Sequence, residues 1–421
     1  MGSGDDGLGE AAQRVPAAST PRFQIKREAI LAAAAQEFNQ HGIRGATLAG
    51  VASRVGLLKA SLNYYYRRKE DLAAECMLQA IAAVHDIAAT AREQQRDAEG
   101  RVRAFLAGKA ALHAEVTESR RGPLVSFDEV RALTAPQGDR VAEAYAQLFR
   151  AVREFFPRSL GFSRDQRNAR THLLLALANA MPGWLNRYEA ADYPAAADAL
   201  TDMLVGGLLQ PQWHDAALPQ PRLAAAPDAG ADTVNGAFLR AATMLINEQG
   251  FRGASVERIS ATLNLTKGAF YHHHDSKDDL VAQCFARSFE VIRDTQLRAM
   301  ALTDSGVQRL LASSFALVCF QLSEQGPLLR SSARSVLAES PRRDTMQRGS
   351  QLTQRFALFI VDGMAEGALR TVDATLAAQQ VAAMINAASS LRWWVSGIRQ
   401  DDVVRLFARP LFTGLLSPGE A

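Results

Sequence analysis

Apolar residues recur at helical spacing along most of the chain, while runs of alternating β-branched residues are scarce. Spacings of three, four and five residues place apolar side chains on one face of a helix. The first such face consists of Ile25, Ala29, Ile30, Ala33, Ala34 and Phe38. Because this periodicity continues through the chain, we predict an all-helical (all-α) protein.

Glycine and hydroxyl residues divide the first helical stretch into short elements. Gly42 should end the first helix, because glycine readily adopts the left-handed conformation of a helix C-cap. Thr47 can then cap a short second helix from Leu48 to Val55. After a tight turn we expect a third helix from Lys59 to Tyr65 and a longer fourth helix from Lys69 to about Thr90.

The same elements occur a second time. Residues 29–76 and 237–284 align without a gap at a constant offset of 208, and 16 of the 48 aligned pairs are identical. The second copy predicts a helix that ends at Gly250, an N-cap at Ser255 and a helix from Lys267 to His273. Solenoid repeats have periods of roughly 20 to 50 residues, so this longer period indicates two complete domains of one kind.

Each copy has the form of a helix-turn-helix unit, in which two short helices joined by a tight turn are supported by a longer preceding helix. The third helix of such a unit can enter the major groove of DNA, where its first residues face base edges. Small residues allow close approach, and ammonium, hydroxyl and imidazole groups suit phosphate oxygens. The predicted DNA-binding residues are Thr47, Lys59, Ala60, Ser61, Asn63, Tyr64, Tyr65 and Lys69 in the first copy, and Ser255, Lys267, Gly268, Ala269, Tyr271, His272, His273 and Lys277 in the second.

The formal net charge of +3 hides a difference between the two copies. Residues 21–72 contain nine basic and four acidic side chains, a net charge of +5. Residues 231–280 contain five basic and six acidic side chains, a net charge of −1. A basic surface suits a polyanion such as DNA, so only the first copy has the expected electrostatic character.

Both copies resemble the DNA-binding domain of the TetR family of bacterial transcriptional regulators. The run Gly-Ala-Phe-Tyr-His-His-His-Asp-Ser-Lys-Asp-Asp-Leu at 268–280 is very similar to that family's signature. The run at 60–72 is similar too, with Asn63 where the family usually has tyrosine. Histidine replaces the usual aromatic residue at His274, a position that Tyr66 fills in the first copy.

The resemblance implies a duplicated TetR-like architecture, in which each three-helix domain is followed by a helical bundle for ligand binding and dimerisation. It also implies binding to double-stranded operator DNA, usually repression, relieved by an unidentified small-molecule effector. No cofactor is implied. We find no Gly-rich phosphate loop and no nucleophile motif in the sequence, so we expect no enzyme activity.

The duplication extends beyond the opening helices, since a Gly-Pro-Leu triplet occurs at 122–124 and again at 326–328. Four prolines between residues 211 and 231 indicate a semi-rigid linker. We therefore expect a disordered tail (1–20), a first helix-turn-helix domain (21–72), a first C-terminal helical domain (73–210), a linker (211–231), a second helix-turn-helix domain (232–280) and a second C-terminal helical domain (281–417).

Three arrangements are consistent with two such domains, here called the first and second heads, in one chain. In the first, the halves form a covalent pseudo-dimer that reads two unlike half-sites about 34 Å apart. In the second, two chains form a homodimer in which four heads, or only the first, basic head of each chain, contact DNA. In the third, the second head is a degenerate reader or a module for protein interaction or sensing.

No apolar stretch in the sequence reaches the length needed to span a bilayer, and the best candidate, residues 310–322, is too short and contains polar side chains. The N-terminus lacks the apolar core of a signal peptide. Three cysteines provide no disulfide framework. We therefore expect a soluble, cytoplasmic protein without a membrane partner.

Two further groups of residues suggest chemistry that the helical pattern makes improbable. The three histidines at 272–274 are successive residues on a helix, about 100° apart, so they cannot converge on one ion and we predict no metal site. Their protonation would instead strengthen DNA binding at lower pH. Cys76 and Cys284 occupy matching positions, and we interpret them as buried small residues in preference to a redox switch.

Aromatic residues late in each half are the only candidates for a ligand site. Trp184, Trp393 and Trp394 either line a pocket or pack between helices, and the sequence does not separate the two. Pockets in helical bundles are lined mostly by apolar side chains, so a small apolar or amphipathic ligand is expected.

Overall fold

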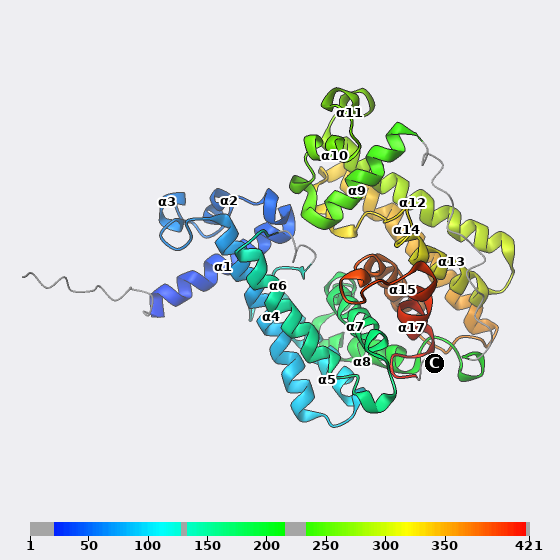
Figure 1. Ribbon diagram of the computed structural model, residues 1–421. Helices are drawn as coiled ribbons and strands as arrows, with labels where there is room; N and C mark the ends of the chain where they lie inside the picture. Colours follow the sequence, from blue (N-terminus) through cyan, green and yellow to red (C-terminus); the bar gives the residue numbers. More distant parts are fainter. Residues whose placement is uncertain (1–20, 128–132, 215–232, 418–421) are drawn as a thin grey trace, which may run out of the picture.

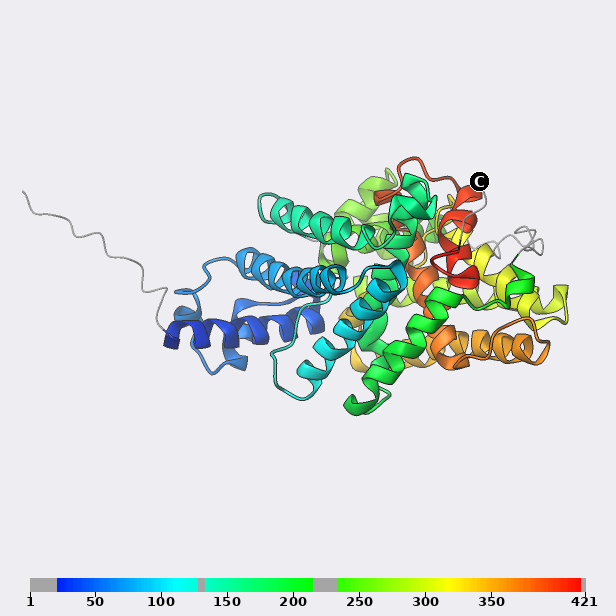
Figure 2. The ribbon, with the colours of Figure 1, turned by 90° about the horizontal axis from the view of Figure 1, so that it is seen from below.

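The computed structural model describes residues 21–127, 133–214 and 233–417. The predicted tail and the predicted linker beyond His214 lie outside these residues. Within them the protein is built from helices, with a single isolated β-bridge between Leu209 and Leu369. The predicted all-α fold is confirmed. Figures 1 and 2 show the first head projecting from one side of a larger helical body.

The first head and the helix that follows it consist of α1 (Pro21–Gly45), α2 (Leu48–Arg54), α3 (Lys59–Leu62) and α4 (Lys69–Gln94). Gly42 has a φ of 69°, the left-handed conformation expected of it, but α1 resumes after this kink and ends at Gly45, three residues later than predicted. The side chain of Thr47 accepts a hydrogen bond from the Gly50 amide at 3.0 Å, so the predicted N-cap of α2 is present.

The second head repeats this arrangement in α9 (Val234–Gly253), α10 (Val256–Thr262), α11 (Lys267–His273) and α12 (Lys277–Leu302). Gly250 kinks α9 with a φ of 72°, and Ser255 caps α10 by accepting from the Arg258 amide at 3.2 Å. One difference concerns the third helix. In the first head, α3 ends at Leu62, three residues earlier than predicted.

The C-terminal domains also correspond. Their first helices are capped by Asp97 and by Ser305, which lie 208 residues apart, so the constant offset continues past both heads. The first domain contains α5 (Ala98–Thr117), α6 (Gln137–Arg153), α7 (Arg164–Leu185) and α8 (Tyr193–Gly206), and the second contains α13 (Gly306–Phe320), η5 (Ser331–Val336), α14 (Glu339–Ala365), α15 (Ala374–Ala388), α16 (Gln400–Val403), η7 (Val404–Ala408) and α17 (Arg409–Thr413).

The expectation that no segment is long and apolar enough to span a membrane was wrong for one helix. By length and composition α4 could cross a bilayer, while the segment singled out from the sequence forms only part of the shorter α13 and the turn after it. Half of the apolar window of α4 is buried within the protein. The helix packs against α1, α5 and α6, which accounts for its apolar residues as those of a core helix.

The two halves share one hydrophobic core. Buried side chains of α7 in the first half and of α15 in the second belong to the same cluster, and these helices lie side by side. Backbone segments also join across the halves: the amide of Leu209 donates to the carbonyl of Phe412 at 2.8 Å, and that of Gln210 to Ala368 at 2.9 Å. Together these contacts make one body of the two C-terminal domains.

Backbone approach between the halves is close enough to require glycine at one position. Gly207 has a φ of 74°, and a Cβ there would lie 2.4 Å from the carbonyl oxygen of Phe412. Arg370 of the second half fixes the same turn by donating from Nη1 to the carbonyls of Asp202, at 2.9 Å, and Gly207, at 2.8 Å.

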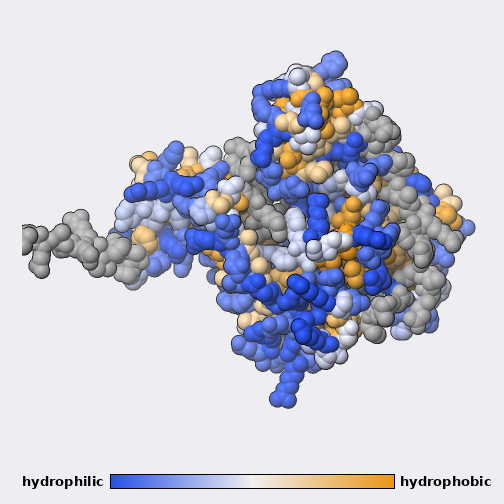
Figure 3. All heavy atoms as spheres, in the orientation of Figure 1, coloured by the Kyte–Doolittle hydropathy of each residue, from blue (hydrophilic) through white to orange (hydrophobic). Residues whose placement is uncertain are grey.

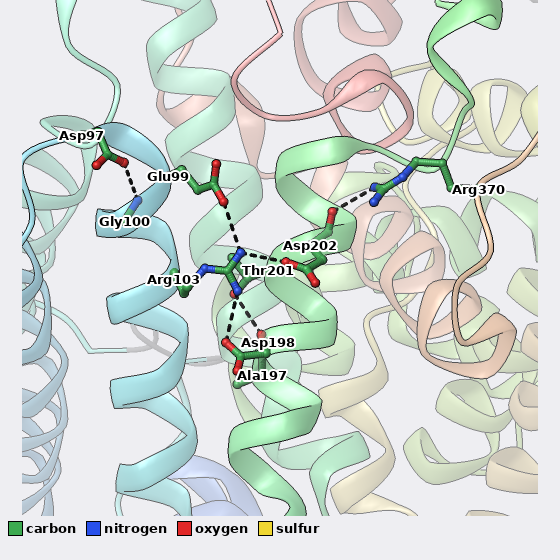
Figure 4. Close-up of polar contacts among 9 residues, drawn as sticks. All are labelled: Asp97, Glu99, Gly100, Arg103, Ala197, Asp198, Thr201, Asp202 and Arg370. Carbon is green, nitrogen blue, oxygen red and sulfur yellow. Dashed lines mark hydrogen bonds and ion pairs between the residues drawn. The ribbon is translucent and has the colours of Figure 1, made fainter.

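Figure 4 shows the polar cluster beside this junction. The guanidinium of Arg103 on α5 donates to the carboxylates of Asp202 at 2.7 Å, Glu99 at 3.2 Å and Asp198 at 3.2 Å. These carboxylates, that of Asp202 first, raise the pKa of Arg103. The cluster ties α5 to α8, whose end receives Arg370 from the other half, so it supports the junction of the halves.

Candidate nucleic-acid interface

The helices α3 and α11, which we call the recognition helices, each follow a turn that contains one residue with a positive φ. Gly56 has a φ of 63°, and Asn264, its counterpart 208 residues later, has a φ of 54°. Glycine and asparagine tolerate this left-handed conformation best. Each turn is therefore built for one backbone shape, which directs α3 and α11 to the outer tips of their heads, as Figure 1 shows.

The apolar skeleton beneath each turn follows the predicted pattern. Val51 and Leu62 are buried in the first head, and Ile259 and Phe270 are buried in the second. Beyond this point the cores differ. The first head belongs to the core shared by both halves, whereas the second has a separate core with Leu329 and two other residues at and beside η5.

In the first head the predicted contact residues lie on an exposed surface. Lys59, Ala60, Ser61, Asn63 and Tyr64 are exposed, as is Thr47, while Tyr65 and Lys69 are half-buried. Phe23 of α1 stacks on Tyr65 with ring centroids 5.0 Å apart and meets the ring of Tyr64 edge-on at 6.4 Å. The start of α1 thus holds both tyrosines beside the recognition helix.

In the second head, the outward-facing predicted residues are also exposed, but one of them is neutralised. Gly268, Tyr271, His272 and His273 are exposed, and Ser255 and Ala269 are half-buried. Lys267 donates from Nζ to Oε1 of Glu257 at 2.6 Å. This hydrogen bond lowers the pKa of Glu257 to about 2 and raises that of Lys267. Position 49, the counterpart of Glu257, is alanine.

Both heads expose apolar side chains, so their surfaces differ chiefly in charge. In Figure 3, apolar side chains gather on the second head at the top of the view, and hydrophilic ones predominate on the first head at the left. Exposed apolar side chains nevertheless occur on both heads: Val234 and Met244 on α9 are 48% and 41% exposed, and Ile25 and Leu58 of the first head are 69% and 78% exposed. It is the negative net charge of the second head that makes it the less suitable surface for a polyanion.

Lys277 makes an internal contact where the sequence suggested a phosphate contact. Its Nζ donates to the carbonyl of Phe251 and lies 4.0 Å from the centroid of that ring. It therefore supports the end of α9. Its ammonium group is engaged within the head before any DNA is present.

A polar network behind the recognition helix has charged members only in the first head. Glu75 accepts hydrogen bonds from the guanidinium of Arg27 and from the hydroxyl of Tyr66, the latter at 2.7 Å. At the corresponding positions the second head has Gln283, Asn235 and His274. His274 is 1% exposed, and neither ring nitrogen has a hydrogen-bond partner in the described part of the chain.

Burial also determines the state of the cysteines and of that histidine. The thiols of Cys76 and Cys284 point to the carbonyls of Leu31 and Leu239, at 3.7 and 3.5 Å. Burial raises both thiol pKa values to about 12, so almost no reactive thiolate exists at neutral pH. Packing, the preferred interpretation, is supported. Burial likewise lowers the pKa of His274.

Two asparagines that the sequence analysis passed over join each head to its own C-terminal domain. Asn39 donates to the carbonyl of Leu124 at 2.9 Å and accepts from the amide of Ser126 at 2.8 Å. Asn247 donates to Leu328 at 2.9 Å and accepts from Arg330 at 3.0 Å. Together they form one of the 16 identical pairs, which was the available signal. We call them the head clamps.

The three tryptophans proposed as ligand candidates all line one cavity of about 980 Å³. Trp184 is 3% exposed, and Trp394 stacks on Phe149 with ring centroids 3.6 Å apart. Both sequence interpretations therefore apply, because these rings pack between helices and also border the cavity. No group of His, Cys, Asp and Glu side chains suited to a metal ion occurs among residues 21–127, 133–214 and 233–417.

Two curated relatives align with parts of the chain. HTH-type transcriptional repressor DhaR of Mycobacterium sp. (strain GP1) is 29% identical over 132 residues, which cover 30% of this chain and 66% of DhaR. Transposon Tn10 TetC protein of Escherichia coli is 34% identical over 55 residues, 13% of this chain and 28% of TetC. The chain thus spans just under two thirds of the first relative and less than a third of the second.

Solved structures align with about one half of the chain. A TetR family transcriptional regulator, PfmR from Thermus thermophilus, is 22% identical, with 42% of this chain and 98% of PfmR covered and a TM-score of 0.35. AibR in complex with isovaleryl coenzyme A and operator DNA is 18% identical, with 42% and 97% covered and a TM-score of 0.35.

The model of the family described as bacterial regulatory proteins, tetR family, matches the chain in two places. The matches cover residues 30–76 and residues 238–284. Both matches begin within the first helix of a head, contain the turn and the recognition helix, and end on the fourth helix. The chain therefore contains two copies of a domain of the tetR family of bacterial regulatory proteins, one in each head.

Proposed function

We propose that this protein is a sequence-specific DNA-binding transcriptional regulator that acts as a covalent pseudo-dimer. The two heads of one chain take the place of the heads of two subunits. The proposal is supported by two complete helix-turn-helix units with exposed recognition helices. Repression is the expected sign of regulation, because the relative DhaR is described as a transcriptional repressor. We expect it to act in the cytoplasm, without enzyme activity.

The observation that carries the pseudo-dimer is the shared core of the two halves. Asn168 on α7 donates to the carbonyl of Trp394 at 2.8 Å, and Arg170 donates from Nε to that of Leu415 at 3.0 Å. Both donors are buried. A face of the first half that is filled in this way by the second half is not available to another chain.

The operator should be asymmetric, because the heads differ. The first recognition surface contains Lys59, Asn63 and Tyr64, and the second contains Lys267, Tyr271 and His272 at corresponding positions. Base edges in the major groove distinguish such side chains. Two unlike half-sites separated by about one helical turn, roughly 34 Å, are therefore expected in place of a palindrome.

The mass of the complex tests this proposal. DNA selected from a random duplex library by the purified chain provides the ligand, and light scattering then gives the mass of the chain free and bound. One chain on each selected site, together with two protected half-sites of different sequence, is the expected result. Two chains on a palindromic site would contradict the pseudo-dimer and favour a homodimer.

One observation favours an alternative in which the second head contributes little to DNA binding. Lys267 is already paired with Glu257, and Lys277 with the Phe251 carbonyl, before DNA is present. In that case the second head would act as a degenerate reader, or as a surface for protein interaction or sensing. A double variant, Lys267→Ala with Tyr271→Ala, would then keep wild-type affinity for the selected DNA.

The matched variant in the first head, Lys59→Ala with Tyr64→Ala, provides the comparison. Under the pseudo-dimer, both double variants lose affinity, and protection of only the mutated half-site weakens. A loss confined to the first-head variant would establish the alternative. Loss of salt dependence in proportion to the lysines removed would identify them as phosphate contacts.

We further propose that a small-molecule effector controls DNA binding through the C-terminal domains. The cavity that contains the three tryptophans supports this, since its volume of about 980 Å³ lies at the upper end of the range of roughly 300–1,000 Å³ for ligand pockets. The two head clamps, Asn39 and Asn247, also border the cavity. A bound molecule would therefore contact the residues that attach each head to its C-terminal domain.

A further inference from the structure

The cavity lies between the two halves and is bordered by helices of both. From the first half, α5 contributes Lys109, Leu112, His113 and Val116, whose spacing places them on one helical face. From the second half, α12, α14 and α15 contribute a largely apolar wall. The counterparts Asn179 on α7 and Asn386 on α15 both border the same space, so the two halves line one cavity in common, here called the chamber.

Lys109 is distinctive both in the sequence and in this chamber. The chain has six lysines, and the other five all lie in the two head segments, 21–72 and 232–280. Nζ of Lys109 donates to Oδ1 of Asn179 at 3.4 Å, which is its one polar contact in the described part of the chain. No carboxylate of residues 21–127, 133–214 or 233–417 pairs with it, and burial lowers its pKa to about 8.

The charged groups around the chamber are predominantly basic. Arg187 lies on its border in the first half, and Arg330 and Arg334 lie on its border in the second. Among the described residues of this border, Glu248 is the one with an acidic side chain, and it is paired with Arg392 at 3.6 Å. A net positive lining around an apolar space attracts an anion and disfavours a cation.

The chamber is also bordered by a hydrogen-bond donor that has no acceptor among the described residues. Nε1 of Trp184 is buried and has no hydrogen-bond partner within the described residues, although a buried indole N–H normally finds one. Trp184 borders the chamber, as does Asn179, whose amide oxygen is used by Lys109 and whose amide nitrogen can still donate. An anionic group that accepts hydrogen bonds would suit both the free N–H donors and the lysine that has no carboxylate partner among the described residues.

We propose that this chamber binds one amphipathic organic anion per chain, with its acidic group at Lys109 and Asn179 and its apolar body against the wall of the second half. Single occupancy follows from the charge distribution, because position 317, the counterpart of Lys109, is a buried leucine. Identification of this anion as the effector rests on the proposed function. Its binding to the chamber does not.

A pair of fluorescent probes tests the proposal without DNA, so its failure is distinguishable from failure of the regulatory function. 8-Anilinonaphthalene-1-sulfonate and N-phenyl-1-naphthylamine share an aromatic body, but only the first carries an anionic group. Three of the four tryptophans border the chamber, so quenching of tryptophan emission reports occupancy. We expect one sulfonate probe per chain, bound at least about tenfold more tightly than the neutral probe.

Substitution of the lysine decides whether that preference comes from the chamber. Lys109→Met should weaken the sulfonate probe about tenfold and leave the neutral probe unchanged. Lys267→Met, which removes an exposed lysine far from the chamber lining, should change neither. Equal affinity of the wild type for both probes, two equivalent sites per chain, or an undiminished sulfonate preference in Lys109→Met would each overturn the proposal.

A third variant, Lys109→Arg, tests whether Lys109→Met has collapsed the chamber instead of only removing its charge. If Lys109→Met loses both probes, Lys109→Arg restores the charge and most of the side-chain volume. Recovery of sulfonate binding in Lys109→Arg supports the anion site. An arginine variant that binds the sulfonate no better than the neutral probe overturns it.

Discussion

Asn39 and Asn247 lie 208 residues apart and make the same pair of hydrogen bonds, each to the leucine of the Gly-Pro-Leu triplet of its own half and to the residue two positions later. An amide side chain that donates to one carbonyl and accepts from the amide two residues later fixes both position and orientation. Each head is thereby attached to its C-terminal domain at a point beside the shared chamber. This duplicated contact joins each head to a backbone segment that borders the chamber.

Asn247→Ala should loosen the second head alone. It removes two hydrogen bonds and leaves the Leu328 carbonyl and the Arg330 amide without their partner, at a cost of about 1–3 kcal/mol. Hydrogen exchange measured by mass spectrometry should then be faster in α9–α11 and unchanged in α13 and α15. Asn39→Ala is the matched control, with the effect moved to α1–α3. Equal acceleration of both heads in either variant would contradict independent attachment.

Glu257→Ala should strengthen DNA binding by the second head. The substitution frees Lys267 from its ion pair, so that one more ammonium group is available to a phosphate. The slope of log affinity against log salt concentration should become steeper by about 0.9 on duplex DNA. An unchanged salt slope would show that Lys267 does not approach the backbone.

Ala49→Glu is the reciprocal change. Position 49 corresponds to Glu257, so a carboxylate there should pair with Lys59 and weaken binding by the first head. The salt slope should become shallower by about the same 0.9. Ala49→Gln, which has nearly the same shape without the charge, should leave the slope at its wild-type value.

Acid should destabilise the second head through His274. Burial lowers the pKa of this histidine below its ordinary value of 6.5, so the folded head favours the neutral ring. The contribution to stability is complete above the unfolded pKa and is lost as the pH falls through 6.5 toward the lower folded pKa. Asp279, 3.9 Å away, opposes this shift and His273 adds to it, without reversing its direction.

Hydrogen exchange at pH 7.5 and 5.5, corrected for the intrinsic rate, measures this loss. Protection should fall in α10 and α11 and persist in α2 and α3, where Tyr66 occupies the corresponding position. His274→Tyr should make the second head insensitive to pH over this interval. Stronger DNA binding at low pH remains a prediction for His272 and His273 alone, which are exposed. Equal loss in both heads would point to a different titrating group.

Gly56 and Asn264 both have a positive φ, so replacing the glycine and introducing a glycine should have opposite effects on stability. Gly56→Ala should destabilise the first head by about 1–2 kcal/mol, because alanine is strained at a positive φ. No atom lies within 4 Å of the added Cβ, so the cost is that of the backbone alone. Asn264→Gly should stabilise the second head or leave it unchanged. Hydrogen exchange of each head, measured as the temperature is raised, gives the stability of the two heads separately. A lower stability of the second head in Asn264→Gly would contradict the interpretation that the positive φ of this turn favours glycine.

Features encoded by neighbouring residues were predictable from the sequence. The left-handed conformations of Gly42 and Gly250 and the caps at Thr47 and Ser255 depend on interactions within a few residues, and all four were predicted. Repetition of the pattern made the duplication evident. The early end of α3 was not predicted. The residues that follow it, 63–65, form a turn in which Tyr65 packs against Phe23, a residue distant in sequence.

Contacts between elements account for what the sequence could not provide. Glu257 and Lys267 are ten residues apart on different helices, so no helical spacing indicates that they pair. The shared chamber depends on how α7 and α15 pack, and Lys109 enters it from a third helix. The sequence shows that Lys109 lies outside the two heads, where the other five lysines are found. Only the packing of the helices shows that Lys109 borders the chamber.

The backbone junction between residues 208–210 and the second half has a consequence for the amount of protein a cell needs. Two separate subunits assemble only above a concentration set by their dissociation constant, whereas joined halves meet at an effective concentration that is independent of copy number. A cell with very few copies of this chain would therefore still hold fully assembled molecules. Each half is also free to change without its partner, because a substitution alters one head and leaves the other as it was.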